Sequence, residues 1–201
     1  MRSPLDRQSE AVNLPLEFFK GFLRNPKEVC SVVPSSRFLA RRVLECGSVA
    51  TARVIVELGA GTGVLTGQIL QRMPADGKLV AVEILPAFAG LLRTSWPDPR
   101  ITVYEGCSTD LEHALAQAGE ERADLVVSGI PFSTLEGGVG RRTLEAAKRV
   151  LGEDGRFVAY QFRSAVRRIA EPVFGPAETH SGFWNIPPMK IYVWRRDASL
   201  S

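Results

Sequence analysis

The stretch Val54-Ile55-Val56-Glu57-Leu58-Gly59-Ala60-Gly61-Thr62-Gly63 decides how this chain folds. An apolar, largely β-branched run leads into three glycines at alternate positions, and a helical pattern follows Gly63. Glycine is needed where a backbone turns sharply after a strand and passes close to a ligand. Val64 stands where the dinucleotide fingerprint would place its last glycine, which disfavours NAD. The stretch therefore predicts a strand, a ligand-binding turn and a helix.

Beyond this unit, short β-branched runs alternate with helical patterns. We expect further strands at 79–83, 101–104, 124–128 and 156–162. Helices are expected to begin near Gly63, Ala87, Asp110, Gly140 and Ser164. Gly155 is read as the stop of the fourth helix, whose apolar positions run from Leu144 to Leu151. This alternation predicts βαβ units and a parallel sheet.

The tail breaks the alternation. Prolines and glycines follow Ala170. Two strands then follow, around 178–184 and 189–195, with no helix between them. They predict a terminal antiparallel hairpin on an otherwise parallel sheet of seven strands.

Two helices are expected ahead of the sheet. Large apolar residues between Leu14 and Leu23 alternate with charged ones, which predicts an amphipathic helix ended by Asn25-Pro26. A second helix is expected over 36–46. We predict a helical segment at 1–30 and one α/β domain at 31–201.

Composition narrows the setting. At 201 residues and 45% hydrophobic content, the chain is long enough for one domain with a core. The net charge of +3 permits an anionic partner without requiring one. Cys30, Cys46 and Cys107 are too widely spaced for a zinc pattern, so no metal is expected, and a reducing cytoplasm is the simplest location. No apolar run is long enough to span a bilayer, so membrane contact would be peripheral.

Two acidic residues are expected beside the glycine loop. Glu83 ends the second strand about twenty residues past Gly63, where a carboxylate binds ribose hydroxyls in dinucleotide folds. Its alternative role is a solvated strand end. Glu57 ends the first strand, where it would attract an ammonium or sulfonium group.

Five segments carry a further pattern: Phe22-Leu23-Arg24-Asn25-Pro26, Val33-Pro34-Ser35-Ser36-Arg37-Phe38-Leu39-Ala40, Val56 to Val64, Val127-Ser128-Gly129-Ile130-Pro131 and Asn185-Ile186-Pro187-Pro188. The Pro-Ser-Ser, Ser-Gly-Ile-Pro and Asn-Ile-Pro-Pro parts are more discriminating than the glycine loop. With these residues the chain resembles the small bacterial phospholipid N-methyltransferases, which convert phosphatidylethanolamine to phosphatidylcholine. The resemblance runs from about Phe19 to Arg196.

The resemblance implies a Rossmann-like class I methyltransferase fold and S-adenosylmethionine as cofactor, with S-adenosylhomocysteine as product. The residues expected to bind the cofactor are Pro34, Ser35, Ser36, Glu57, Gly59, Ala60, Gly61, Thr62, Gly63, Glu83, Ile84, Cys107, Ser108, Ser128, Gly129, Ile130 and Pro131. Many methyltransferases hold an Asp near the adenine amine where Cys107-Ser108 stand here. Asp110 either replaces it or caps a helix.

The resemblance also implies a phospholipid or another amine lipid as acceptor, at the inner face of the membrane. The N-terminal helix then either contacts the membrane or packs as a lid. An amine acceptor must lose a proton, and the candidates for the catalytic group are Tyr160 and His180. Phe132, Trp184 and Asn185 are expected near the substrate, with core packing as the alternative for the aromatic residues.

The main alternative is an RNA adenine methyltransferase, similar to the ribosomal RNA adenine dimethylases. Those enzymes place Asn or Asp two residues before the proline of a Pro-aromatic pair. Pro131-Phe132 supply the pair here, but Gly129 occupies the polar position. Nucleic acid is therefore the less favoured partner. An ornithine lipid is a further possible acceptor, and a cofactor-binding protein without catalysis is the non-enzymatic alternative.

Overall fold

The computed structural model describes residues 33–135, 137–161, 165–181 and 189–196. The chain divides into two units, 1–37 and 38–201, and the description below concerns the second unit together with the helix that leads into it. That helix, α3, spans Val33–Cys46 and so begins earlier than the predicted position 36. The predicted amphipathic helix at 14–24 lies outside the described residues.

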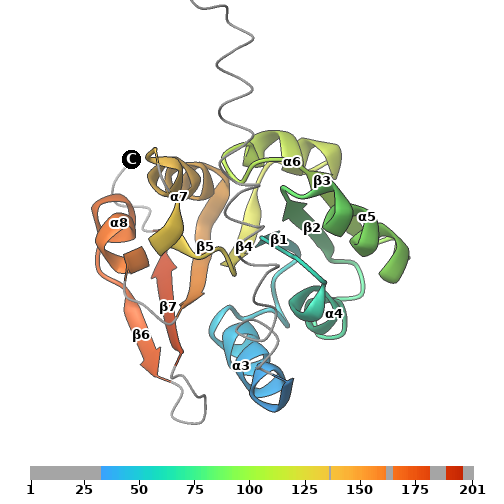
Figure 1. Ribbon diagram of the computed structural model, residues 1–201, viewed down its shortest axis with the longest axis horizontal. Coiled ribbons are helices and arrows are strands. Elements are labelled where there is room, and N and C mark those ends of the chain that lie inside the picture. The colour runs from blue at the N-terminus through green and yellow to red at the C-terminus, as the bar shows by residue number, and fades with distance from the viewer. Residues whose placement is uncertain (1–32, 136, 162–164, 182–188, 197–201) are drawn as a thin grey trace, which may run out of the picture. The chain divides into compact units, whose positions relative to one another are not determined.

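A sheet of seven strands forms the centre of the second unit (Figure 1). Its strands are β1 Val54–Leu58, β2 Lys78–Glu83, β3 Ile101–Glu105, β4 Ala123–Ser128, β5 Leu151–Gln161, β6 Glu178–Ser181 and β7 Lys190–Arg195. The order across the sheet is β3-β2-β1-β4-β5-β7-β6. The first five strands are parallel, whereas β7 runs antiparallel to both β5 and β6. The predicted parallel sheet with an antiparallel hairpin is confirmed.

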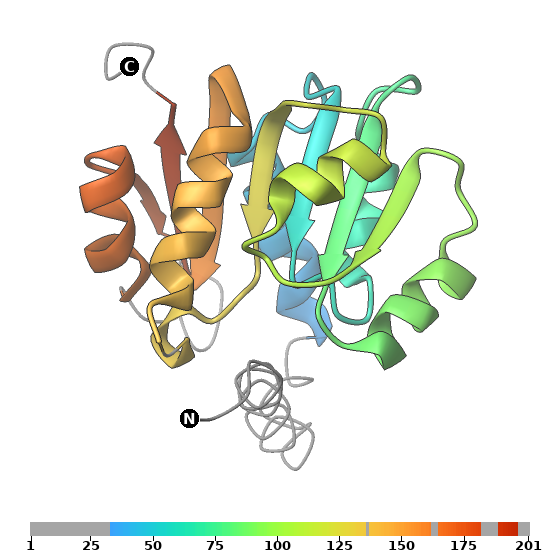
Figure 2. The same cartoon turned by 90° about the horizontal axis from the view of Figure 1, so that it is seen from above.

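Helices cover both faces of the sheet. They are α4 Val64–Leu70, α5 Pro86–Ser95, α6 Leu111–Gln117, α7 Val139–Val150 and α8 Ala165–Phe174. Apolar residues of α6, α7 and α8 pack on one face, and those of α3 and α4 pack on the other (Figures 1 and 2). Because strand side chains alternate between faces, strands buried on both sides are almost wholly apolar, as β1, β2 and β4 are.

The prediction that Gly155 stops the fourth helix is wrong. Helix α7 ends at Val150, and β5 begins at once with Leu151, whose side chain is fully buried. The register against β4 then shifts, because five residues of β5 lie opposite two of β4. Gly155 sits in this bulge, where a Cβ would lie 2.9 Å from the Gly152 carbonyl oxygen. Leu151 fits the helical spacing of Leu144 and Ala147 because α7 and the start of β5 contribute to the same core cluster.

The prolines and glycines after Ala170 do not end the fifth helix at once. Helix α8 continues through Pro172 to Phe174. Phe174 packs against Phe157 with ring centroids 5.5 Å apart, and this contact favours the extra turn. Gly175 then ends the helix at a φ of 83°, which glycine adopts readily.

Candidate functional site

The glycine loop leaves β1 through a sequence of left-handed turns. Gly59, Gly61 and Gly63 have φ values of 72°, 55° and 81°, which other residues rarely adopt. The Gly59 amide donates to the Val82 carbonyl at 2.9 Å, which ties the loop to β2. Among the described residues, a Cβ on Gly61 would have no atom within 4 Å. The loop is therefore fixed on its sheet side and open at Gly61.

Trp96 fixes the helix that follows the loop. Gly63 and Gly67 both lie against its indole, and a Cβ on Gly67 would come within 2.2 Å of the ring. Two glycines one turn apart let α4 approach the end of α5 this closely. Gly63 thus serves packing as well as the turn, a role that the loop pattern did not predict.

Glu83 closes the loop from the end of β2. Its side chain is only 5% exposed. One carboxylate oxygen accepts a hydrogen bond from the Gly61 amide at 2.8 Å, and the other accepts one from the Leu85 amide at 3.0 Å. An ionised carboxylate has about four acceptor positions, so two stay available for a ligand. Ile84, the next residue, is 46% exposed and offers an apolar surface beside this acid.

Glu57 lies beneath the loop and is 2% exposed. It accepts a hydrogen bond from the Thr66 hydroxyl at 2.7 Å, which joins β1 to α4. Burial, reinforced by the nearby Glu83 charge, raises the pKa of Glu57 to about 8, although the Thr66 hydrogen bond opposes the rise. Glu57 is therefore mainly neutral below about pH 8, and a cationic ligand beside it would favour its ionised form. Thr66 was missed in the sequence because one hydroxyl in a short helix gives no periodic signal.

The predicted residues after β3 and β4 are mostly held by the protein itself. The hydroxyls of Ser108 and Thr143 are hydrogen bonded at 2.8 Å, and Cys107 is a half-buried free thiol. Ser128 is fully buried and accepts from the Ile130 amide at 3.3 Å. Asp110 occupies the N-cap position of α6 but makes no side-chain cap hydrogen bond.

A second polar residue escaped the sequence interpretation. Gln161 is buried at the end of β5, and its amide donates to the Ile130 carbonyl at 2.6 Å. This bond fixes the backbone that follows β4. In the sequence, a single glutamine near the predicted end of a strand indicates a solvated strand end. Its contact with the Ile130 carbonyl depends on the pairing of β5 with β4, which the sequence does not show.

The two catalytic candidates lie at different distances from the loop. Tyr160 lies on β5 beside Gly129, while His180 is on the edge strand β6. Ile191 of β7 is opposite both, so the three side chains share one face. Two strand spacings, about 10 Å, therefore separate His180 from Tyr160. The structure brings only Tyr160 to the glycine loop.

The predicted substrate residues are placed only in part. Phe132 is 1% exposed and meets Phe157 edge to face, so it belongs to the core and has no surface for an acceptor. Trp184 and Asn185 lie outside the described residues. The backbone of Pro34, Ser35 and Ser36 forms the start of α3, while their side chains lie outside the description.

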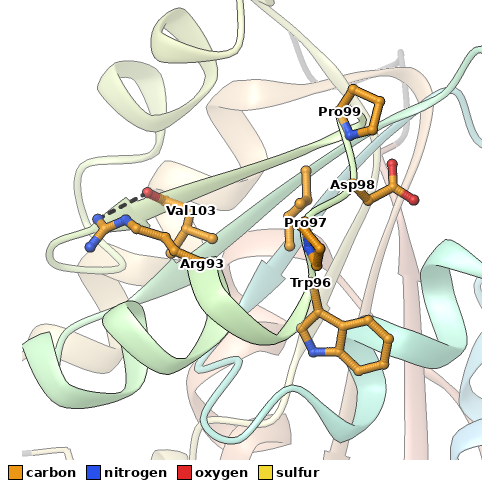
Figure 3. Close-up of a pocket in the computed structure, with 7 residues that line it drawn as sticks. Arg93, Trp96, Pro97, Asp98, Pro99 and Val103 are labelled. Atoms are coloured by element: carbon orange, nitrogen blue, oxygen red, sulfur yellow. Dashed lines mark hydrogen bonds between the residues drawn. The ribbon is translucent and has the colours of Figure 1, made fainter.

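A pocket of about 450 Å³ lies between the end of α5 and β3 (Figure 3). Its charged residues are already paired. Arg93 binds Glu105 at 3.1 Å and the Val103 carbonyl at 3.4 Å, while Asp98 binds Arg100 at 2.7 Å. No glycine-loop residue lines it, so this pocket is not part of the site described above.

The described residues contain no group of His, Cys, Asp and Glu arranged to hold a metal ion. In the same part of the chain, no helix is long and apolar enough to cross a membrane.

Comparison with known proteins gives a consistent result. The family description "methyltransferase small domain" matches residues 32–181. An ornithine lipid N-methyltransferase of Singulisphaera acidiphila is 33% identical over 184 residues, which span 89% of this chain and 94% of that protein.

Solved structures share the fold at lower identity. The N-methyltransferase NodS of Bradyrhizobium japonicum is 14% identical, with a TM-score of 0.66 over 82% of this chain and 97% of that one. The 1,6-didemethyltoxoflavin-N1-methyltransferase of Burkholderia thailandensis, solved with S-adenosylhomocysteine, is 17% identical, with a TM-score of 0.68 over 98% of this chain and 92% of that one.

Proposed function

Because the chain belongs to the methyltransferase small domain family and is an S-adenosylmethionine-dependent methyltransferase, we propose that it methylates the amine of a lipid head group. The observation that carries this proposal is the 33% identity to an ornithine lipid N-methyltransferase across nearly the full length of both chains. An ornithine lipid is therefore the first acceptor to test.

The geometry of the loop supports roles for several of the predicted cofactor-binding residues. Glu83 would hold the ribose hydroxyls with the acceptor positions that Gly61 and Leu85 leave available. The open side of Gly61 would admit the ligand, and the exposed Ile84 would offer an apolar surface to its adenine. The positive amino group of the cofactor would favour the ionised form of Glu57, so this ion pair would form as the cofactor binds. When bound, S-adenosylmethionine supplies a methyl group already activated by a positive sulfur.

The protein's own contribution to transfer is positioning. An ammonium has no lone pair, so the acceptor nitrogen must give its proton to water or a base before it reacts. The hydrogen bonds that anchor the glycine loop and the backbone after β4 keep these segments fixed during that step. Holding both partners in line then lowers the entropic part of the barrier.

Phosphatidylethanolamine is the second acceptor. It is supported by the sequence segments around Pro34-Ser35-Ser36 and Asn185-Ile186-Pro187, which resemble those of phospholipid N-methyltransferases. An RNA adenine acceptor is less favoured, because Gly129 supplies no amide or carboxylate at the end of β4.

The substrate proposal includes peripheral contact with the inner face of the membrane. The amphipathic pattern between Leu14 and Leu23 would supply that contact, with its apolar side in the lipid head-group region. A helix of this length gives modest binding, which suits an enzyme that must leave after methylation.

The test uses the full chain with radiolabelled S-adenosylmethionine. Three acceptors are offered separately: vesicles containing an ornithine lipid, vesicles containing phosphatidylethanolamine, and ribosomal RNA. We expect label in the ornithine lipid first and in phosphatidylethanolamine second. Vesicles of phosphatidylcholine, which already carries three methyl groups on nitrogen, are the control. Label only in RNA, or in no acceptor, contradicts the proposal.

A further inference from the structure

The end of β4 lacks a polar side chain directed at an acceptor. Gly129 has none, and the neighbouring Ser128 is fully buried, with its hydroxyl bound by the Ile130 amide. A methyl acceptor with a polar nitrogen nevertheless needs a hydrogen-bonding partner in a site from which water is excluded. That partner must therefore come from another strand.

Tyr160 of β5 reaches into the space that Gly129 leaves. Its hydroxyl oxygen lies 2.6 Å from the place where a Cβ of residue 129 would be, and its Cζ lies at 3.2 Å. The Gly59 carbonyl oxygen is 3.8 Å from the same point, so the phenol hydroxyl stands at the start of the glycine loop. Tyr160 is thus the polar side chain at the junction of β1, β4 and β5.

This hydroxyl keeps its hydrogen-bonding capacity. No residue in the part of the chain that the structure describes is hydrogen bonded to it, although the side chain is half-buried. Tyr192, also unpaired there, differs because its hydroxyl is fully buried on the opposite face of the sheet. The Tyr160 hydroxyl is not among the buried side-chain atoms without a partner, so it remains accessible to a ligand.

We propose that the Tyr160 hydroxyl, in the side-chain space left by Gly129, is the group that binds the acceptor nitrogen. This inference rests on the proposed function, since it needs an amine acceptor. It assigns to β5 the polar contact that the RNA adenine dimethylases supply from the segment after β4. Gly129 and Tyr160 then act as a pair, because a side chain at 129 would displace the hydroxyl.

The chemistry follows from the state of the phenol. Burial, with the Glu57 charge nearby, raises the pKa of Tyr160 above its ordinary value, so the group stays protonated and is not the base. Its oxygen accepts a hydrogen bond from the acceptor N–H, which orients the nitrogen lone pair. The lone pair forms the new N–C bond while the C–S bond breaks with its electrons going to sulfur. The proton released from nitrogen goes to water.

The test compares Tyr160→Phe with Tyr192→Phe, which removes a hydroxyl from the other face. For Tyr160→Phe we expect kcat to fall about 10- to 100-fold, the range for losing one hydrogen bond in a dry site. Its affinity for S-adenosylmethionine, measured by isothermal titration, should match that of the wild type. Tyr192→Phe should keep wild-type values of both.

A stability cycle tests the geometry without turnover. Gly129→Ala should lower Tm in the wild type, where the new methyl group meets the hydroxyl at 2.6 Å. In the Tyr160→Phe background its nearest neighbour is Cζ at 3.2 Å, so the decrease in Tm should be clearly smaller.

Three results would overturn the inference: an unchanged kcat in Tyr160→Phe, a loss of cofactor affinity in that variant, or equal Tm decreases in both backgrounds. They are distinct from failure of the proposed function, which shows as a wild type that methylates no lipid. If the wild type methylates RNA instead, the same variants are assayed on RNA, and the same outcomes decide.

Discussion

Two buried carboxylates lie on neighbouring strands at the glycine loop, and their partners give them different properties. Glu83 accepts hydrogen bonds from two backbone amides, those of Gly61 and Leu85. Glu57 has one hydroxyl partner and is more deeply buried, so its neutral form is favoured up to about pH 8. Glu83 therefore offers acceptor oxygens in fixed positions. The charge of Glu57, in contrast, depends on pH and on any cation bound beside it.

Replacing Glu83 by Gln should weaken binding of S-adenosylmethionine by about 1–3 kcal/mol, because the amide nitrogen cannot accept the hydrogen bonds that one carboxylate oxygen accepts now. Isothermal titration measures the change. The control is Glu105→Gln, since Glu105 lies opposite Glu83 on β3 but is exposed and paired with Arg93. Equal dissociation constants for Glu83→Gln and the wild type would show that the ribose is held elsewhere.

Glu57 should make the protein less stable as pH rises. Its pKa is about 8 in the folded state against 4.5 ordinarily, so between these values the folded state binds more protons than the unfolded state. Stability from this group is therefore complete below the lower value and is lost as pH rises towards the upper one. Relative to wild type, Glu57→Gln should gain stability between about pH 5 and pH 8.5 in urea denaturation. A difference that is constant with pH would contradict this.

At the level of elements, the contact between α4 and Trp96 sets the position of the loop. Helix α4 has only seven residues, too few to be stable alone. Its orientation depends on Leu65 and Ile69 in the core and on the glycine face that receives the indole. A change on that face should therefore be felt in the ligand loop as well.

Replacing a helical glycine by alanine should lower the stability of the protein at one position and raise it at another. Gly67→Ala places a methyl group 2.2 Å from the Trp96 ring and should destabilise the protein by about 1–3 kcal/mol through overpacking. Gly90→Ala in α5 meets no atom within 4 Å and should stabilise by about 0.5–1 kcal/mol through helix propensity. Thermal denaturation of both variants provides the measurement. A neutral Gly67→Ala would mean that the indole moves aside easily.

The sequence predicted the elements with strong local signals. The strand, glycine turn and helix around Gly61 were recoverable because turn chemistry and apolar runs agree there. The sequence did not predict the bulge at Gly155 or the last turn of α8 after Ala170. Both depend on the residues that pack against them. The position of Tyr160 beside Gly129 was also hidden, since it depends on strand register.

At the scale of the whole domain, parallel strands bring the glycine loop, Glu83 and the end of β4 to one edge of the sheet. A ligand there ties together segments that are distant in sequence. S-adenosylmethionine at 100 times its dissociation constant should add about 2.7 kcal/mol, or a Tm increase of about 5–10 °C. NAD at the same concentration should give none, because Val64 replaces the last fingerprint glycine. Equal shifts with both ligands would count against a selective loop.

The ligand site lies at the carboxyl ends of the parallel strands. The first residues of β1 to β4 lie at the opposite end of the sheet, one strand length away. The turn from Gly119 to Arg122, which precedes β4, lies at this opposite end, and Glu121 is exposed there. A fluorophore or biotin attached at Glu121 would therefore report on or immobilise the enzyme without crowding its ligands. Oriented attachment of this kind would allow turnover on supported lipid films to be followed one molecule at a time.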